Sequence, residues 1–180
     1  MKYMFASDIH GSAAWCRRTL EAFDHSGAER LILLGDLLYH GPRNDLPEAY
    51  APKEVISLLN PYRNKILAVR GNCDAEVDQM VLQFPIMADY ALLAVNGLNI
   101  FATHGHVFSE EALPPLCDGD ILIHGHTHLP VAEKRDNYYL LNPGSVALPK
   151  GGFANSYGLL EDRTFRILDF EGHVIKEITF

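Results

Sequence analysis

The 180-residue chain has few cysteines, no long apolar run and no surplus of basic residues. No apolar stretch approaches the roughly 20 residues needed to cross a bilayer, and a strand-like segment follows Met1 where a signal peptide would begin. The three cysteines (Cys16, Cys73 and Cys117) are an odd number without paired spacing, which indicates a reducing compartment rather than a disulfide framework. These absences predict a cytoplasmic protein without a membrane anchor.

Positive charge is scarce: the chain has 15 Lys and Arg residues but 23 Asp and Glu residues, which gives a formal net charge of -8. No basic run is long enough to follow a phosphate backbone, so stable nucleic-acid binding is not expected. A small phosphate-bearing substrate remains compatible with this charge, because bound divalent cations concentrate positive potential at one spot.

The chain is rich in apolar residues, which make up 48% of it. That fraction and this length predict one compact domain over residues 1–180. No internal repeat, linker or low-complexity segment interrupts it. The first half alternates strand patterns with helix patterns. Strands are predicted over residues 2–7, 31–34 and 65–69, and helices over residues 13–26, 52–59 and 75–82.

The second half reads mostly as antiparallel strands, and it opens with a hairpin signal at Asn96-Gly97. Strands are predicted over residues 90–95, 98–103, 121–123, 131–135, 138–141, 157–160, 165–170 and 174–180, with a weak helix over 109–116. An α/β half followed by a β-rich half predicts a four-layer αββα sandwich, in which two mixed β-sheets are flanked by helices. The apolar alternation of the terminal strands fits a sheet core or contacts with a second copy, so a homo-oligomer is an open alternative.

Seven polar side chains follow the predicted strands and form the candidate site. They are Asp8, His10, Asp36, Asn72, His104, His126 and His128. Successive ligand-bearing segments are separated along the chain by about the length of one β-α-β unit, roughly 30 residues. Because the carboxyl ends of strands in open α/β sheets form the ligand crevice, these segments are expected to converge.

The seven side chains comprise two carboxylates, one amide and four imidazoles. Taken singly, helix capping or turn chemistry explains the carboxylates and the amide. Jointly, the set favours metal binding, because seven donors are too many for one ion and suit two ions that share a carboxylate. Mixed nitrogen and oxygen donors favour Mn²⁺, Zn²⁺ or Fe over Ca²⁺ or Mg²⁺.

The order of these motifs resembles the calcineurin-like metallophosphoesterase superfamily, and in particular its YfcE-type branch of small bacterial and archaeal phosphodiesterases. The motifs are Asp8-x-His10, Gly35-Asp36, Gly71-Asn72-x-Asp74, His104-Gly105-His106, Gly125-His126-x-His128 and Asn142-Pro143-Gly144-Ser145. The resemblance covers essentially the whole chain and implies the fold of that superfamily.

The resemblance also implies how the ligands divide between two divalent metal ions, most simply Mn²⁺. One ion would be held by Asp8, His10, Asp36 and His128, and the other by Asp36, Asn72, His104 and His126. It implies a phosphodiesterase that hydrolyses small substrates by in-line attack of a metal-bridging hydroxide. Two alternatives stay open: a phosphomonoesterase or nucleotide phosphatase, and a non-catalytic scaffold like the eukaryotic retromer subunit that shares the fold. The intact ligand set argues against the scaffold.

Five further residues are candidates for catalysis or substrate binding. The resemblance implies catalytic roles for Asp74 and for the residue before it, which is histidine in many members of the superfamily but Cys73 here. A thiol is a poor substitute as a proton donor, so Cys73 favours substrates with good leaving groups or recruitment of His106; burial as a small apolar side chain is the alternative. Arg43 and His40 lie in the loop after Asp36 and are candidates for binding the phosphate.

Overall fold

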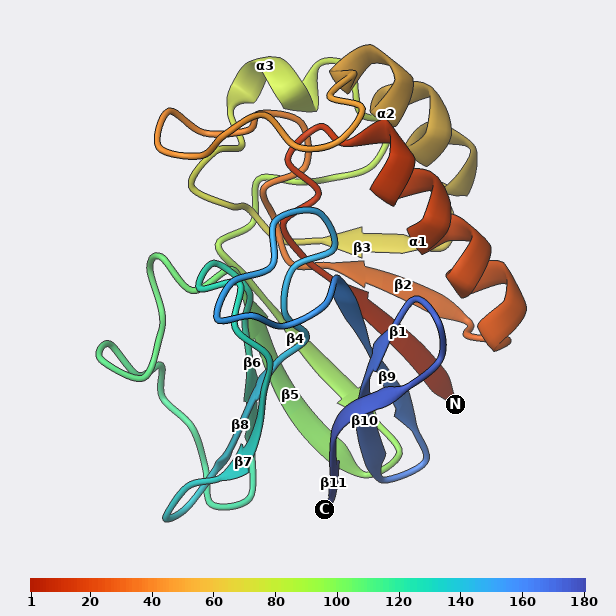
Figure 1. Ribbon diagram of the computed structural model, residues 1–180. Helices are drawn as coiled ribbons and strands as arrows, with labels where there is room; N and C mark the ends of the chain where they lie inside the picture. Colours follow the sequence, from red (N-terminus) through yellow and green to blue (C-terminus); the bar gives the residue numbers. More distant parts are fainter.

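The computed structural model describes residues 1–180 and contains two mixed β-sheets packed face to face (Figure 1). The first sheet has six strands in the order β11-β10-β9-β1-β2-β3. These strands are β1 (Lys2–Ala6), β2 (Arg30–Leu33), β3 (Ile66–Ala68), β9 (Ser156–Glu161), β10 (Thr164–Asp169) and β11 (Val174–Thr179). The strands β1, β2 and β3 are parallel, and the other three continue the sheet as an antiparallel meander. The buried run Leu31, Ile32 and Leu33 makes β2 a central strand covered on both faces.

The second sheet has five strands in the order β4-β5-β6-β8-β7. They are β4 (Tyr90–Val95), β5 (Leu98–Thr103), β6 (Ile121–Ile123), β7 (Val131–Lys134) and β8 (Tyr139–Asn142). Asn96 and Gly97 turn the β4–β5 hairpin with φ of 53° and 72°, the left-handed pair that a tight two-residue hairpin requires. The strand β5 is parallel to β6, and β6 is parallel to β8.

Helices cover the outer face of the first sheet (Figure 1). They are α1 (Ala13–Ser26), α2 (Pro52–Leu59), the 3-10 turn η1 (Asn60–Tyr62) and the short α3 (Glu76–Gln79). Ser12 caps α1 by accepting the N–H of Trp15 at 3.3 Å, and Gly27 ends it in the left-handed conformation. None of these helices has the length and apolar character needed to cross a bilayer.

The outer face of the second sheet is covered by an irregular segment, and the predicted helix over residues 109–116 is wrong. Only a few residues of this segment precede Pro114 and Pro115. A helix that short cannot form enough hydrogen bonds to offset its unfavourable nucleation. The segment is anchored instead by Phe108 and Leu116, which pack on an apolar cluster around Phe101. The predicted helix over 75–82 is confirmed only for residues 76–79.

The two sheets share an apolar core to which Phe5 and Ile32 contribute from the first sheet and Ile100 and Ile121 from the second. This packing holds the sheets rigidly together at their strand ends. The loops after β1, β2 and β3 in one sheet, and after β5 and β6 in the other, therefore meet along one edge of the sandwich.

Candidate metal centre

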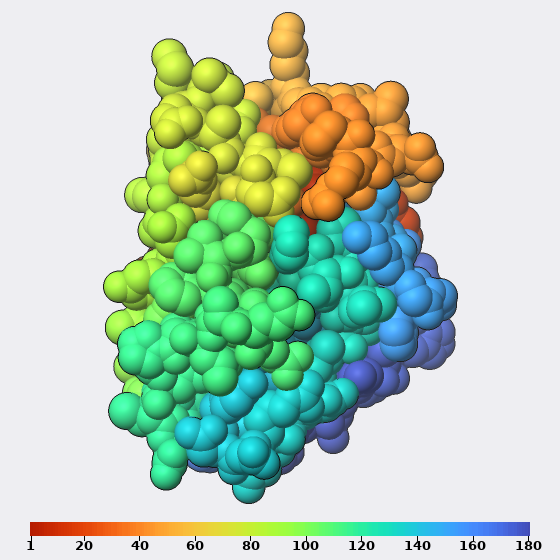
Figure 2. Space-filling view, turned by 90° about the vertical axis from the view of Figure 1, so that its left-hand side faces the viewer, coloured from red at the N-terminus to blue at the C-terminus, as the bar shows by residue number.

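The loops at this edge bring all seven predicted ligands together. Asp8 and His104 are fully buried, and His10, Asp36 and His128 are at most 3% exposed. Asn72 is exposed and His126 is half-buried, and both help to line a cavity of about 860 Å³ that opens to solvent. In Figure 2, the surface segments near residues 40, 70, 126 and 150 meet around this hollow.

One group of donor atoms gathers around Asp8. The Nε2 atom of His128 lies 3.3 Å from Asp8 Oδ1, and the Nε2 atom of His10 lies 3.6 Å from the same oxygen. His10 Nε2 is also 3.6 Å from Oδ2 of Asp36. These four side chains converge from three loops.

A second group gathers on the other side of Asp36. The Nε2 atom of His104 lies 3.4 Å from Asp36 Oδ2 and 3.1 Å from the amide oxygen of Asn72. The Nδ1 atom of His126 lies 3.3 Å from His104 Nε2. Asp36 Oδ2 thus faces an imidazole of each group.

Backbone carbonyls orient three of the four imidazoles. Each ring donates its Nδ1–H to one carbonyl oxygen: His10 to Tyr39 at 2.9 Å, His104 to Leu34 at 2.6 Å and His128 to Leu148 at 2.5 Å. A carbonyl can only accept, so Nδ1 carries the hydrogen and the Nε2 lone pair is left for a ligand. This is the arrangement that fixes metal-binding histidines in proteins.

Two buried polar atoms at the centre have no hydrogen-bond partner, Asp8 Oδ1 and His10 Nε2. Leaving a buried polar atom unsatisfied costs about 1–3 kcal/mol, so such atoms are rare without a reason. A divalent cation between them would satisfy both. The residues present therefore fit a metal ion.

The charges of the centre support the same conclusion. Burial alone would raise the pKa of Asp8, but the nearby imidazoles of His10, His128 and His104 hold it well below its ordinary value. Burial opposes protonation of His104, yet the Asp36 and Asp8 carboxylates raise its pKa to about 9. Both carboxylates are therefore ionised and available to a cation, which must displace protons from the imidazoles as it binds.

Five of the seven predicted ligands have left-handed backbone conformations. Their φ values are 61° for Asp8, 48° for His10, 57° for Asp36, 63° for His126 and 61° for His128. Only three other non-glycine residues have positive φ. Each such conformation costs about 1–3 kcal/mol and tends to persist at functional sites. The backbone strain of this protein is thus concentrated at the candidate ligands.

Glycines allow the ligand loops to approach one another closely, as the motifs predicted. A Cβ atom on Gly71 would lie 2.1 Å from Asp36 Oδ1, and one on Gly125 would lie 1.8 Å from Ser7 Oγ. Neither position has room for a side chain.

Asp74 lines the cavity but its carboxylate is engaged by the backbone. It is 2% exposed and accepts N–H groups from Asp36 at 2.8 Å, Leu37 at 2.9 Å and Gly71 at 2.7 Å. Asp74 therefore joins the loop after β2 to the loop after β3.

Cys73 also lines the cavity and contacts the centre through its backbone. Its N–H donates to Asp36 Oδ1 at 2.8 Å, and its sulfur accepts from Asn72 Nδ2 at 3.3 Å. Burial and the nearby Asp36 carboxylate raise the pKa of the thiol to about 12, so the sulfur is protonated. It presents a neutral group to the cavity.

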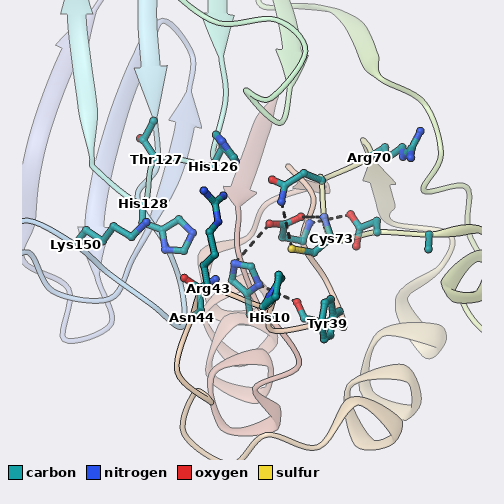
Figure 3. A pocket seen from close by; sticks show the side chains of 16 residues that line it. His10, Tyr39, Arg43, Asn44, Arg70, Cys73, His126, Thr127, His128 and Lys150 are labelled. Carbon is teal, nitrogen blue, oxygen red and sulfur yellow. Dashed lines mark hydrogen bonds and ion pairs between the residues drawn. The ribbon is translucent and has the colours of Figure 1, made fainter.

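The other three predicted residues have different positions. Arg43 lines the cavity and extends into it (Figure 3). His40 does not line it, because its ring packs edge-on against Tyr39 and Tyr50 with centroids 4.8 and 5.2 Å away. His106 does not line it either; its ring centroid lies 5.4 Å from that of His104.

Several lining residues were not predicted from the sequence, among them Arg70, Lys150, Thr127, Asn44 and Tyr39. Lys150 and Arg70 add two cations to Arg43 around the opening. Arg70 adjoins the Gly71-Asn72 motif, which was the available signal for it. Lys150 lies far from every proposed ligand in the sequence, which concealed its role.

The turn at Asn142 to Ser145 also has a role that the sequence did not reveal. The Nδ2 atom of Asn142 donates to the Gly125 carbonyl at 2.8 Å and to Thr127 Oγ1 at 3.0 Å. Ser145 donates to the Asp8 carbonyl at 3.1 Å. This turn therefore holds the first and last ligand loops against each other.

Comparison with known proteins identifies the family. Residues 1–164 match the calcineurin-like phosphoesterase superfamily domain. The chain belongs to the calcineurin-like phosphoesterase superfamily. Phosphodiesterase YfcE of Escherichia coli K12 is 54% identical over 168 residues, which cover 93% of this chain and 91% of YfcE. An archaeal phosphodiesterase of Methanocaldococcus jannaschii is 28% identical over 152 residues, 80% of this chain and 83% of the relative.

Solved structures confirm the predicted superfamily fold with its two mixed β-sheets. The structure of the Escherichia coli phosphoesterase YfcE superposes with a TM-score of 0.98 at 50% identity and covers 99% of both chains. Vps29 of Entamoeba histolytica shares the fold, with a TM-score of 0.65 at 22% identity over 100% of this chain and 99% of the other. Membership of the superfamily, together with the metal-type cluster of carboxylates and imidazoles, makes this chain a metal-dependent phosphoesterase that uses divalent ions.

Proposed function

We propose that the protein is a phosphodiesterase with two divalent metal ions, most simply Mn²⁺, with Zn²⁺ and Fe as alternatives. The observation that carries the proposal is the position of Asp36 Oδ2, which lies 3.6 Å from His10 Nε2 on one side and 3.4 Å from His104 Nε2 on the other. A carboxylate oxygen between two imidazole groups is suited to bridge two ions.

The two donor groups match the division of ligands that the motifs implied. The first ion is assigned to Asp8, His10, Asp36 and His128, and the second to Asp36, Asn72, His104 and His126. When bound, the ions supply an activated water for in-line attack on phosphorus and neutralise charge on the phosphoryl oxygens. The three backbone-anchored imidazoles preorganise this centre, so little rearrangement accompanies binding.

The residues that line the cavity determine how it attracts a substrate and which leaving groups it favours. Arg43, Arg70 and Lys150 come from three separate loops and surround the opening with positive charge that attracts a phosphate. Cys73 offers a neutral thiol where many superfamily members have histidine, so turnover is expected to depend on leaving groups that depart without a strong proton donor. Asp74 is assigned a positioning role, because its oxygens already accept backbone N–H groups.

A small phosphodiester is the substrate class that these features support best. The cavity of about 860 Å³ accommodates a small molecule, while the net charge of -8 disfavours a long nucleic acid. The names of the two phosphodiesterase relatives favour a diester over a monoester. A phosphomonoester is the second candidate, because the three cations at the opening would attract its phosphate group as well.

The preference is tested by comparing bis(p-nitrophenyl) phosphate with p-nitrophenyl phosphate, using protein loaded with Mn²⁺ and a chelator-treated sample as the control. We expect kcat/KM for the diester to exceed that for the monoester by about tenfold or more, with loss of both activities after chelation. Faster monoester hydrolysis would reverse the assignment. Absence of turnover with both substrates would favour the scaffold alternative.

A further inference from the structure

A second cavity of about 420 Å³ adjoins the metal cavity and lies between α2 and residues 73–81. We call it the apolar groove, and it is lined chiefly by Tyr39, Pro52, Ile56, Ala75, Val77 and Val81. Tyr39, Cys73 and Ala75 line both cavities. The groove and the metal cavity therefore share a wall formed by these three residues.

Three of the apolar side chains that line the groove are exposed and lie outside the hydrophobic core. Val77 is 66% exposed, Val81 43% and Tyr39 42%. No residue of α3 is buried. Exposed apolar side chains gathered along a cavity are typical of ligand sites.

Polar contacts hold the segment that carries Val77 and Val81. The Oδ2 atom of Asp78 accepts the N–H of Ala75 at 2.8 Å. The Gln79 amide donates to the carbonyls of Leu82 at 3.2 Å and Phe84 at 3.0 Å, and it accepts the N–H of Ile86 at 2.8 Å. The segment thus stays in place without burying either valine.

The groove opens next to the proposed metal ligands. The carbonyl of Tyr39 orients His10 at 2.9 Å, and the N–H of Cys73 donates to Asp36 Oδ1 at 2.8 Å. Figure 3 shows Tyr39 and Cys73 at one end of the metal cavity and Lys150 and Thr127 at the other. The groove therefore adjoins the end of the metal cavity that lies opposite Lys150.

We propose that the apolar groove binds an apolar, preferably aromatic, ester group of the substrate while its phosphate lies in the metal cavity. The inference rests on the proposed phosphodiesterase function and narrows its substrate class. A phosphodiester carries two ester groups, and one that extends past Tyr39 and Cys73 would exchange water for contacts with Val77 and Val81. The hydrophobic gain would favour an aryl group over a methyl group at this position.

Calorimetric titration of Mn²⁺-loaded protein with methylphosphonate and phenylphosphonate tests the inference without turnover, because neither compound has an ester bond to hydrolyse. We expect phenylphosphonate to bind about tenfold more tightly than methylphosphonate, as partial burial of a phenyl ring implies. Replacing both valines, Val77→Ser with Val81→Ser, should reduce that ratio to about twofold or less. Met80→Ser is the matched control, because Met80 is 84% exposed on the same segment and does not line the groove.

Inorganic phosphate serves as the reference ligand, and its affinity should be the same in wild type, double variant and control. Equal affinities of the two phosphonates for the wild type, or a full phenyl preference in the double variant, would overturn the groove assignment alone. The groove assignment would also be overturned if the double variant kept the phenyl preference but differed from the wild type in the molecular mass measured by light scattering. That result would assign the groove to a contact between two copies of the chain. Failure of the metal-loaded wild type to bind inorganic phosphate would overturn the proposed function itself.

Discussion

At the scale of single residues, Asp74 shows how one buried carboxylate can fix a catalytic edge. It accepts three backbone N–H groups and joins the loop that carries Asp36 to the loop that carries Asn72. Hydrogen bonds to a charged acceptor contribute about 1.5–3 kcal/mol each, more than neutral ones. The motif alone suggested a catalytic carboxylate, because a sequence does not show which backbone groups surround a side chain.

The substitution Asp74→Asn separates the positioning role from a catalytic one. The amide keeps one acceptor and turns a donor toward backbone N–H groups, so we expect a loss of about 2–3 kcal/mol in the free energy of unfolding and weaker metal binding. A positioning role predicts that kcat falls equally for diesters with good and poor leaving groups. Urea denaturation and kinetics with both kinds of diester are the measurements.

The matched control for this variant is Asp78→Asn. Asp78 also accepts a backbone N–H, from Ala75 at 2.8 Å, but it makes no hydrogen bond to any of the seven proposed ligands. Its replacement should leave metal binding unchanged. A loss of rate confined to poor leaving groups in Asp74→Asn would contradict the positioning role and assign proton transfer to this carboxylate.

At the scale of elements, short-range chemistry predicted most boundaries, and the exceptions have physical causes. The Asn96-Gly97 hairpin and the Gly27 helix end follow from residues that accept positive φ, which is a local property. The conformation of residues 109–116 depends on contacts with the second sheet. A local sequence pattern does not contain that information. The position of His40 was likewise decided by its packing against Tyr39 and Tyr50.

The turn between β10 and β11 predicts a measurable titration far from the metal centre. The Nδ1 atom of His173 lies 2.8 Å from Asp169 Oδ2, and that hydrogen bond raises the pKa of His173 above 6.5. Burial tends to raise the pKa of Asp169, but its bonds with His173 outweigh burial and lower the pKa below 3.8. The histidine contribution to stability is complete below pH 6.5 and disappears as pH rises through the raised pKa of His173.

The carboxylate contribution behaves in the opposite sense: it is complete above pH 3.8 and disappears as pH falls through the lowered pKa of Asp169. The pair therefore stabilises the turn most between these two ordinary values. An NMR titration should give a pKa above 6.5 for His173 in the wild type and a lower value in Asp169→Asn. Asp162→Asn, in the neighbouring turn, is the control and should leave the His173 titration unchanged. An identical His173 titration in Asp169→Asn and wild type would refute the pairing.

At the scale of the whole molecule, the fold places negative charge and backbone strain at one edge. The carboxyl ends of β1, β2 and β3 in one sheet meet those of β5 and β6 in the other, and five left-handed ligand residues lie there. The order of the motifs along the chain was enough to predict this convergence. The surrounding cations were not predicted, because Arg70 and Lys150 approach the cavity only after the loops fold.

Metal binding should therefore stabilise the whole chain. Because a preformed site binds cations in the folded state, Mn²⁺ at about 100 times its Kd is expected to raise the melting temperature by about 5–10 °C. Differential scanning calorimetry with Mn²⁺ and with a chelator measures this shift. Equal melting temperatures in both conditions would be inconsistent with a metal site built into the fold.

If Asp36 joins two metal ions in one centre, its replacement should lower the metal content, which elemental analysis of Mn²⁺-loaded protein measures. We expect two ions per chain in the wild type, fewer than two in Asp36→Asn, and two in Asp136→Asn, which alters an exposed carboxylate in the β7–β8 turn. Diester hydrolysis should fall with the metal content. A wild type without bound metal, or an Asp36→Asn variant that keeps two ions and full activity, would rule out a centre joined by Asp36.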